Sequence, residues 1–410
     1  MSEYILKDFP ARHELIDWYR HNKTDRVLEV NAHLHTPYSF SAFRNVEQIF
    51  NMAVSERVGV LGINDFFVAD GFEAFYKHSL RTRIFPLFNI EMIGLGRADM
   101  EAGRRVNDPN NPGRTYISGK ALSYPLNISN DKLEILKDVK DLSNEHVYRM
   151  TLKVNDILGG IDNKLVIDFD IMTNDHTRGM VRERHLAGLI RMKIEDNYKW
   201  GKDRDGIFLT LLGNGYFDIK PGDNAKLENL IRSELLKSGG SAYVEEDPKI
   251  FIDPEEIRDL ILDAGGIPTY PFLADFEDGR YTDFEIDRTT AAQSLLSRGY
   301  YCVEFIPSRN DFGRLRDYVM YLYDRGFIIT FGTEHNSPGM KPLEVRAAGN
   351  IELDEYLLKI NYEGACIMAA HQYKTAIEGR GYLDDQGKPK AVERMEFIKL
   401  GNRIIKTVCS

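Results

Sequence analysis

Cysteine and long apolar runs are scarce in this sequence of 410 residues. Its three cysteines are widely spaced and form no CxxC pair, which argues against both a disulfide framework and a cysteine zinc site. No stretch approaches the roughly 20 consecutive apolar residues that span a membrane, and the N-terminal segment has scattered charges instead of an apolar core. We therefore expect a cytoplasmic protein that is neither secreted nor inserted in a membrane.

The motifs of two large enzyme classes are also missing. Neither a GxSxG elbow nor a GxGxxG fingerprint occurs, so a serine hydrolase and a nicotinamide-dependent enzyme have no support. The segment GRTYISGK, residues 113–120, has one residue too many between its glycines for a P-loop, and Ala121 stands where that motif needs Ser or Thr. We interpret this segment as a loop that crosses the entrance of a site.

The composition favours a folded, acidic protein. Hydrophobic residues make up 43% of the chain, enough to bury a full core. The 63 Asp and Glu residues outnumber the 53 Lys and Arg residues, which gives a net charge of -10. An acidic molecule repels polyanions and membrane surfaces unless a local basic patch intervenes. We therefore expect a small-molecule substrate and no nucleic acid or membrane partner, and an oligomer stays open.

Short apolar runs rich in β-branched residues alternate with segments of helical spacing. Helices are expected from about Asn45 and from about Gly71, between the early runs. A later helix has a clear start, because Asp253 is a good N-cap and Pro254 suits the first turn. The apolar runs occupy residues 27–35, 58–65, 84–92, 265–271, 299–307 and 326–335. This alternation predicts an α/β fold with a mainly parallel sheet.

The middle of the chain differs, with a turn-rich stretch followed by helix-like runs. We expect residues 1–96 to form an N-terminal helix and the first barrel strands, and residues 97–250 to form a mostly helical insertion or cap. Residues 251–410 then supply the remaining strands and the C-terminal helices. The last helix is expected over residues 391–408, where apolar residues recur at helical spacing.

Side chains able to bind a metal stand at the ends of these runs. His33 and His35 are two positions apart, so a strand would point both imidazoles to the same side, an arrangement that suits a transition metal. A single HxH pair or a single acid at a strand end more often has a structural role. The prediction of a metal site therefore depends on finding such residues at the ends of several strands. Acidic residues stand at or near the ends of four other runs: Asp65, Glu91, Glu304 and Glu334. Because the carboxyl ends of parallel strands meet at one face of a barrel, we predict a metal-centred site there.

Six segments resemble, in order, the motifs of the polymerase and histidinol phosphatase (PHP) superfamily of metal-dependent phosphoesterases: HLHTPYS, GINDF, PLFNIEM, AGGIPTYP, VEFIPSR and GTEHNSP. The similarity covers roughly residues 28–95 and 253–345 and leaves the insertion unmatched. It implies a distorted TIM-like barrel of seven β/α units with up to three divalent metals. By this resemblance His33 and His35 match the opening HxH, Asp65 matches the acid of the second motif, and Glu91 matches the bridging glutamate.

The sequence departs from the superfamily pattern at three positions. Phe66, Tyr270 and Asn336 stand where the pattern has histidines, so three expected imidazoles are missing. Tyr270 or Asn336 could instead hold a bound water. The ligands of the first metal survive: His33, His35, Glu91 and Glu334. We therefore predict one well-held divalent metal, and a mixed histidine and carboxylate set accepts Zn, Mn or Fe.

Further groups could take part in catalysis. Asp65 could serve as a general base or as a partner that orients a ligand, and His335 could replace a lost ligand. His185 in the insertion could act as a general acid or a ligand, although a structural histidine is the commoner case. Arg309, near the end of a strand, could supply the charge of a second metal to a phosphate. Arginines of the insertion are alternatives, although an exposed basic helix face is the commoner explanation: Arg178, Arg182 and Arg184.

These features predict a metal-dependent hydrolase, most simply a phosphoesterase acting on a small phosphorylated or carboxylated metabolite. The metal would lower the pKa of bound water toward about 7, and the insertion would cover the barrel mouth and choose the substrate. Two alternatives stay open. One is a lyase or isomerase acting on a sugar or sugar acid, and the other is a barrel that has lost catalysis and retains a metal or ligand.

Overall fold

The computed structural model describes residues 13–15, 27–177, 180–199, 201–275 and 279–409. Most of the region expected to form the N-terminal helix lies outside these ranges. Seven strands form one sheet in which the spatial order equals the order along the chain. The strands are β1 Glu29–Leu34, β2 Val58–Phe66, β3 Phe85–Leu95, β4 Arg114–Lys120, β5 Ile267–Phe272, β6 Cys302–Phe305 and β7 Ile328–Phe331.

The sheet closes into a distorted barrel, as predicted. Strands β1 to β3 pair in parallel, as do β5 to β7, whereas β4 runs antiparallel to both of its neighbours. A parallel bridge between Leu34 and Glu334 joins β1 to the chain just beyond β7. The carboxyl ends of six strands therefore meet at one mouth, where a barrel fold places its chemistry.

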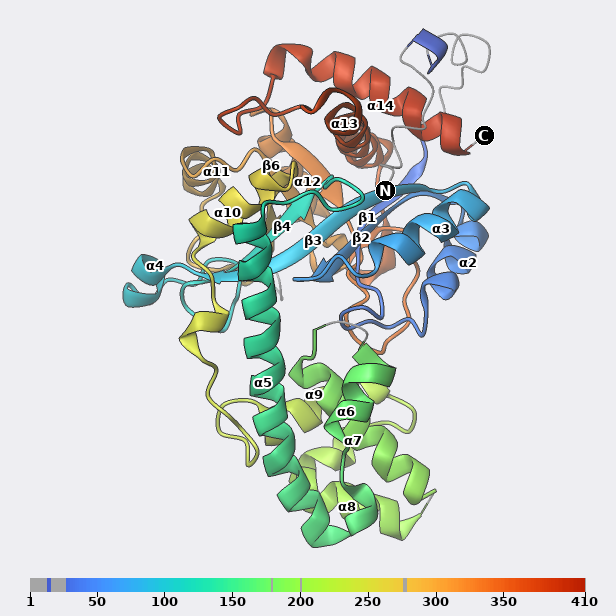
Figure 1. Cartoon of the computed structure of the whole chain (residues 1–410), viewed down its shortest axis with the longest axis vertical. Helices are drawn as coiled ribbons and strands as arrows, with labels where there is room; N and C mark the ends of the chain where they lie inside the picture. Colours follow the sequence, from blue (N-terminus) through green and yellow to red (C-terminus); the bar gives the residue numbers. More distant parts are fainter. Residues whose placement is uncertain (1–12, 16–26, 178–179, 200, 276–278, 410) are drawn as a thin grey trace.

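Helices cover the outside of the barrel (Figure 1). They are α2 Val46–Glu56, α3 Phe72–Thr82, α10 Pro254–Asp263, α11 Arg288–Ser297, α12 Phe312–Tyr323, α13 Glu355–Glu378 and α14 Arg394–Cys409. A short helix, α4 Arg97–Glu101, projects from the barrel (Figure 1). Two starts follow from local chemistry, as the sequence predicted. The side chain of Asn45 accepts from Gln48 N at 2.9 Å, and that of Asp253 accepts from Glu255 N at 2.8 Å. Short β strands Arg346–Ala347 (β8) and Ile351–Glu352 (β9) form a separate hairpin.

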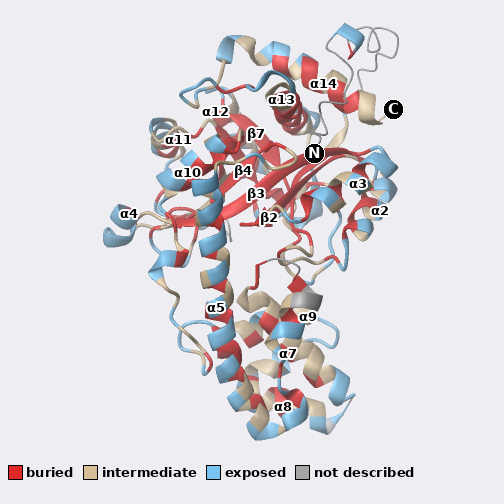
Figure 2. Ribbon diagram, in the orientation of Figure 1, coloured by how far each residue is buried: buried red, intermediate tan, exposed pale blue. Residues whose placement is uncertain are grey.

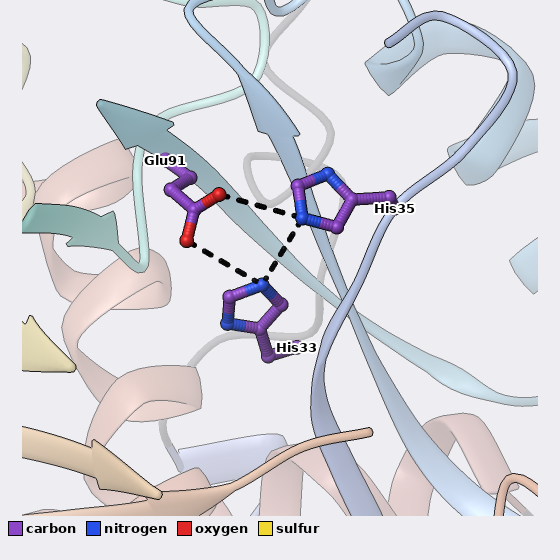
Figure 3. Close-up of side chains that lie close together, drawn as sticks. All are labelled: His33, His35 and Glu91. Carbon is purple, nitrogen blue, oxygen red and sulfur yellow. Dashed lines mark hydrogen bonds and ion pairs between the residues drawn. The ribbon is translucent and has the colours of Figure 1, made fainter. Parts of the chain in front are cut away.

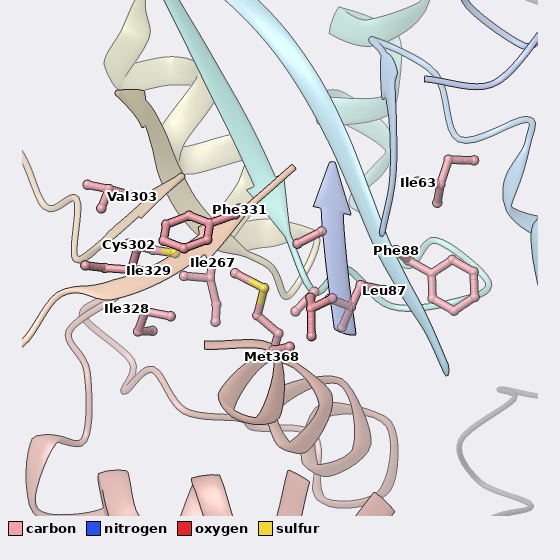
Figure 4. Close-up of a cluster of buried hydrophobic side chains, with 14 of the residues drawn as sticks. Ile63, Leu87, Phe88, Ile267, Cys302, Val303, Ile328, Ile329, Phe331 and Met368 are labelled. Atoms are coloured by element: carbon pink, nitrogen blue, oxygen red, sulfur yellow. The ribbon is translucent and has the colours of Figure 1, made fainter. Parts of the chain in front are cut away.

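The main core lies between the barrel wall and its helices, and the strands are buried along almost their whole length (Figure 2). On one side Ile329 and Phe331 of β7 and Ile267 of β5 lie in a buried cluster with Leu87 of β3 and Met368 of α13 (Figure 4). Helix α13 packs against both β7 and β1, so the strands that meet at the barrel closure share one covering helix. This packing fixes the end of β1, which carries the histidine pair.

Strand β4 shows that two predictions from the sequence were wrong. Residues 113–120 were interpreted as an entrance loop inside an insertion that begins at residue 97, but β4 is a barrel strand between β3 and β5. The alternation of apolar and polar residues is obscured because Lys120, a charged residue, is fully buried against Glu304. Gly119 further weakens the pattern, and it lies close to Ile261 of α10. The insertion therefore excludes this strand.

The insertion itself is helical and has its own hydrophobic core, separate from that of the barrel. A long helix, α5, runs from the barrel into this cap (Figure 1). The α-helices of the cap are α5 Asn130–Ile161, α6 Phe169–Ile171, α7 Glu183–Asn197, α8 Lys202–Leu212 and α9 Asn224–Ile231. Shorter turns of 3-10 or π type are Asn163–Leu165, Met172–Thr177, Gly213–Asp218, Arg232–Leu236 and Pro248–Ile250. None of the described helices of the chain has the length and apolarity needed to cross a membrane.

Candidate metal centre

Three predicted ligands converge at the mouth of the barrel (Figure 3). The Nε2 atoms of His33 and His35 lie 3.5 Å apart. Glu91, near the middle of β3, places one carboxylate oxygen 3.9 Å from His33 Nε2 and the other 3.4 Å from His35 Nε2. The donor atoms of all three residues lie within 4.8 Å of one another, and all three side chains are buried. The arrangement has the nitrogen and oxygen donors that a transition metal prefers.

The second ring nitrogen of His33 is held by a carboxylate. His33 Nδ1 donates to Glu304 Oε2 at 2.9 Å, which leaves the lone pair of Nε2 facing the other ligands. Lys120 Nζ lies 2.6 Å from the same oxygen and also donates to Ala32 O at 3.2 Å. Burial alone would raise the pKa of Glu304, but Lys120 and His33 hold it well below its usual range. Glu304 is thus an ionised partner for His33.

Two polar residues complete the surroundings of His33. Ser118 on β4 donates to Glu304 Oε1 at 2.5 Å, and Asn64 Nδ2 donates to Ser118 Oγ at 3.0 Å. Asn64 Nδ2 also lies 3.1 Å from His33 Nε2. These contacts come from β2 and β4, so the barrel wall on both sides fixes the ring.

His35 is oriented by a second chain of hydrogen bonds. Ser39 Oγ donates to Asp65 Oδ1 at 2.7 Å and so is free to accept from His35 Nδ1, 3.2 Å away. Asp65 also accepts from Thr36 N at 2.7 Å and from Thr36 Oγ1 at 2.5 Å. With its lone pairs used in this way, Asp65 holds the loop after β1 and orients His35 through Ser39. This geometry fits the role of Asp65 as a partner that orients a ligand better than it fits the role of a general base.

Burial shifts the pKa values of two of these three residues, His35 and Glu91. Burial lowers the pKa of His35 to about 4, so its imidazole is neutral at neutral pH. Burial raises the pKa of Glu91 to about 7, although His33 nearby opposes this rise. With Nδ1 of both histidines donating elsewhere, the two Nε2 atoms face the carboxyl group of Glu91, and Asn64 Nδ2 also lies within hydrogen-bond distance of His33 Nε2. Two imidazole nitrogens and a carboxyl group that face one another form a set of donors that a cation can bridge, so the residues present fit a divalent metal.

Glu334, the predicted fourth ligand, lies beside this group but is engaged by other residues. Its Oε2 accepts from Arg309 Nη2 at 2.5 Å and from Asn336 Nδ2 at 2.5 Å. Burial favours a higher pKa, and the guanidinium of Arg309 brings the pKa of Glu334 below its usual range. Arg309 therefore reaches the barrel mouth, as expected, with its charge already paired. The role of Glu334 as a metal ligand stays a prediction.

His335 has both ring nitrogens occupied away from the three ligands. Nδ1 lies 2.7 Å from Thr333 Oγ1, and Nε2 lies 2.9 Å from Lys341 O. Its ring is stacked on Phe43, with centroids 4.8 Å apart. These contacts fix the loop that follows β7, and the geometry favours a structural role over a replacement ligand.

His185 joins the cap to the barrel. Its Nε2 donates to Ser39 O at 2.6 Å, and its Nδ1 accepts from Arg182 N at 3.0 Å. Burial lowers its pKa to about 4, in line with a neutral ring that both donates and accepts. This is the structural alternative that the sequence left open. Arg182 and Arg184 also reach the barrel mouth, whereas Arg178 lies outside the described residues.

The residues at the three altered positions have other partners. Phe66 lies beneath the guanidinium of Arg182, with Cζ 5.2 Å from the ring centroid. The hydroxyl of Tyr270 donates to the buried Glu285 at 2.8 Å, and Asn336 donates to Glu334. Phe66 therefore contacts the cap, Tyr270 contacts a buried carboxylate, and Asn336 supports an acid of the site.

Several of these residues had no assigned role in the sequence interpretation. Lys120, Ser118, Asn64 and Ser39 all act through another residue, which is visible only when strands far apart in sequence are brought together. Glu304 was noted as a strand-end acid without a role. The one signal in the sequence was that a lysine and an acidic residue stand at the ends of two apolar runs. That signal does not show which lysine and which acid contact each other in the fold.

No family model and no curated protein sequence matches this chain. Solved structures with a similar fold include the following two. One, from Bifidobacterium adolescentis, is described as a candidate metal-dependent phosphoesterase; it is 12% identical, with a TM-score of 0.52 over 82% of this chain and 96% of the other. The second is an amidohydrolase from Chromobacterium violaceum with bound sulfate and no metal; it is 14% identical, with a TM-score of 0.50 over 81% and 96%. At these identities the comparison shows a shared fold.

Proposed function

We propose that this protein is a metal-dependent hydrolase and that its substrates are small phosphate esters. The observation that supports this most strongly is the convergence of His33, His35 and Glu91 within 4.8 Å at the carboxyl ends of the barrel strands. The likeness in fold to a protein described as a candidate metal-dependent phosphoesterase adds support. One divalent ion per chain, Zn, Mn or Fe, is the expected cofactor.

A bound ion would supply Lewis acidity, which lowers the pKa of water toward about 7 and polarises a phosphoryl or carbonyl oxygen. The protein's own residues prepare the site for it. Glu304 and Ser39 hold the two imidazoles so that both Nε2 atoms face inward. The charged pair of Arg309 and Glu334 lies at the rim of the mouth.

The cap lies over the mouth, because Arg182 contacts the end of β2, whereas Arg184 and His185 contact the loops that follow β7 and β1. The three ligands are almost fully buried beneath it. A substrate must therefore be small enough to bind between cap and barrel, and the cap excludes bulk water from the site.

The first test is the metal content per chain of protein purified without added metal or chelator. We expect about one transition-metal ion in the wild type and none in the variant with both His33→Ala and His35→Ala. His78→Ala is the matched control, because that ring is stacked on Phe50 away from the site. Wild-type protein without metal, even after supply of Zn, Mn and Fe, would contradict the proposal.

The second test is hydrolysis of a panel of small phosphate monoesters by the metal-loaded protein. We expect phosphate release that the double variant lacks. An amide substrate is the second candidate, favoured by the fold shared with an amidohydrolase. Metal-dependent turnover of amides without release from any phosphate ester would replace the phosphoesterase proposal, and metal binding with no turnover would favour the non-catalytic alternative.

A further inference from the structure

The N-terminal end of α7 carries two arginines with different surroundings. Arg182 lies 3.5 Å from a carboxylate oxygen of Glu183 and 3.7 Å from one of Glu246. Arg184 has no carboxylate oxygen within 4.0 Å among the residues that the structure describes, and its Nη1 donates only to the backbone oxygen of Asn336, at 3.2 Å. Its charge is therefore unmatched by a direct ion pair.

Other partly buried arginines of the cap are paired. Arg191 lies 2.8 Å from Glu228, and Arg232 lies 2.7 Å from Glu183. Glu183 directly precedes Arg184, yet its carboxylate is turned to Arg232 and Arg182. Arg184 thus differs from its neighbours in a region where acidic partners are abundant.

A single residue separates Arg184 from His35, and another separates it from Glu334. Its Cζ lies 5.2 Å from the ring centroid of Phe40, and that ring lies 4.7 Å from the ring of His35. The backbone oxygen of Asn336 accepts from Arg184, while the side chain of Asn336 donates to Glu334. The guanidinium is therefore part of the surface that faces the site from the cap.

A cation in this position is unfavourable without an anion. Removing a charge from water without a partner costs free energy, and burial lowers the pKa of Arg184 as that cost requires. A guanidinium binds phosphate or carboxylate through two parallel hydrogen bonds, and the positive end of the α7 dipole acts in the same direction. The surroundings thus favour binding of an oxyanion.

We propose that Arg184 is the receptor for an oxyanion of the substrate, a phosphate or carboxylate group, bound between the cap and the mouth of the barrel. This deepens the proposed function and rests on it, since it makes the cap the part of the protein that selects an anionic substrate. It also assigns the role to Arg184 in preference to Arg309, whose charge is matched by Glu334.

The test is calorimetric titration of the full chain, after metal removal, with inorganic phosphate and separately with acetate. Working without metal separates this proposal from the hydrolase proposal, because neither metal binding nor turnover enters the measurement. We expect Arg184→Met to weaken binding of the preferred anion at least 10-fold and Arg184→Lys to weaken it less. Arg149→Met is the control, because that arginine is exposed on α5 and pairs only loosely with Glu145, 3.7 Å away. Stronger binding of phosphate or of acetate identifies the source of the oxyanion.

The thermal unfolding temperature in phosphate-free buffer distinguishes anion binding from a structural role of Arg184. If Arg184 were structural, its substitution would lower that temperature. We expect Arg184→Met to unfold at the same temperature as the wild type or higher, because an unmatched charge has been removed. The increase in unfolding temperature that the anion produces in the wild type should be lost. No anion binding by the wild type, or an unchanged affinity in Arg184→Met, would overturn the proposal.

Discussion

Gly332 leaves the space that the β-carbon of His33 occupies. A β-carbon placed on Gly332 would lie 2.3 Å from that of His33 and 2.8 Å from the His33 backbone nitrogen. This contact lies where the end of β7 meets β1, next to the bridge between Leu34 and Glu334. The closure of the barrel and the position of His33, a proposed metal ligand, thus depend on the same glycine.

Gly332→Ala is therefore expected to displace His33. The methyl group must push β1 or β7 aside, and we expect a loss of about 2–4 kcal/mol of unfolding free energy together with loss of bound metal. Urea unfolding and elemental analysis measure the two effects. Gly206→Ala in α8 is the control, because nothing lies within 4 Å of the added carbon; it should stabilise by about 0.5–1 kcal/mol. Normal metal content in Gly332→Ala would contradict this role of the glycine.

Removing the charge of Glu304 should weaken metal binding. Glu304→Gln leaves His33 Nδ1 with a neutral acceptor and leaves Lys120 as an unpaired buried cation. We expect metal affinity to fall about 10–100-fold, as is typical for partners that orient a ligand. We also expect the unfolding free energy to fall by about 3–5 kcal/mol, the usual effect of breaking a buried pair.

The double variant of Glu304→Gln with Lys120→Met separates these two effects. Because it removes both charges, stability should partly recover, while metal affinity stays low. Competition with a chromophoric chelator measures the affinity, and urea unfolding measures the stability. If affinity returned together with stability, the role of Glu304 would be structural support of the barrel instead of orientation of His33.

Most of the fold could be predicted from the sequence because its strongest signals are local. Asn45 and Asp253 cap the helices that follow them through hydrogen bonds within three residues, and six of the seven strands lie in the short, mainly apolar runs of the sequence. The His33 and His35 pair is also local, since a spacing of two directs both rings to one side. Such features require no knowledge of distant contacts.

What the sequence could not give depends on contacts across the barrel. Strand β4 was missed because Lys120 looks like a surface residue until Glu304, far away in the chain, is placed beside it. His335 follows a strand-end acid and looked available, but Thr333 and the carbonyl of Lys341 occupy its ring. In both cases the deciding partner is set by tertiary packing.

Ser39→Ala tests the hydrogen-bond chain to the second histidine. Without the hydroxyl, Nδ1 of His35 loses its acceptor and Asp65 loses one donor, while the backbone bond from Thr36 to Asp65 stays. We expect metal affinity to fall about 10-fold with the fold intact. Ser55→Ala on the exposed side of α2 should leave affinity unchanged. Equal affinities for the two variants would show that His35 needs no such support.

A buried histidine far from the metal centre should make stability depend on pH. The ring of His371 in α13 donates from Nε2 to Gly265 O at 2.7 Å and accepts from Tyr382 N at Nδ1, at 2.9 Å. Burial lowers its pKa to about 4, below the value of about 6.5 in an unfolded chain. The unfolded state therefore binds the proton first as the pH falls.

The contribution of neutral His371 is complete above about pH 6.5 and is lost progressively as the pH falls toward 4, for a total of up to about 3 kcal/mol. His371→Gln keeps a donor for Gly265 O and cannot titrate. It should be less stable than the wild type at pH 7, and the difference should shrink as the pH falls. Because His35 and His185 also have lowered pKa values, the wild type alone is not diagnostic. Urea unfolding of both proteins from pH 7.5 to 4.5 measures the difference, and parallel curves would show that the ring of His371 takes up no proton on unfolding.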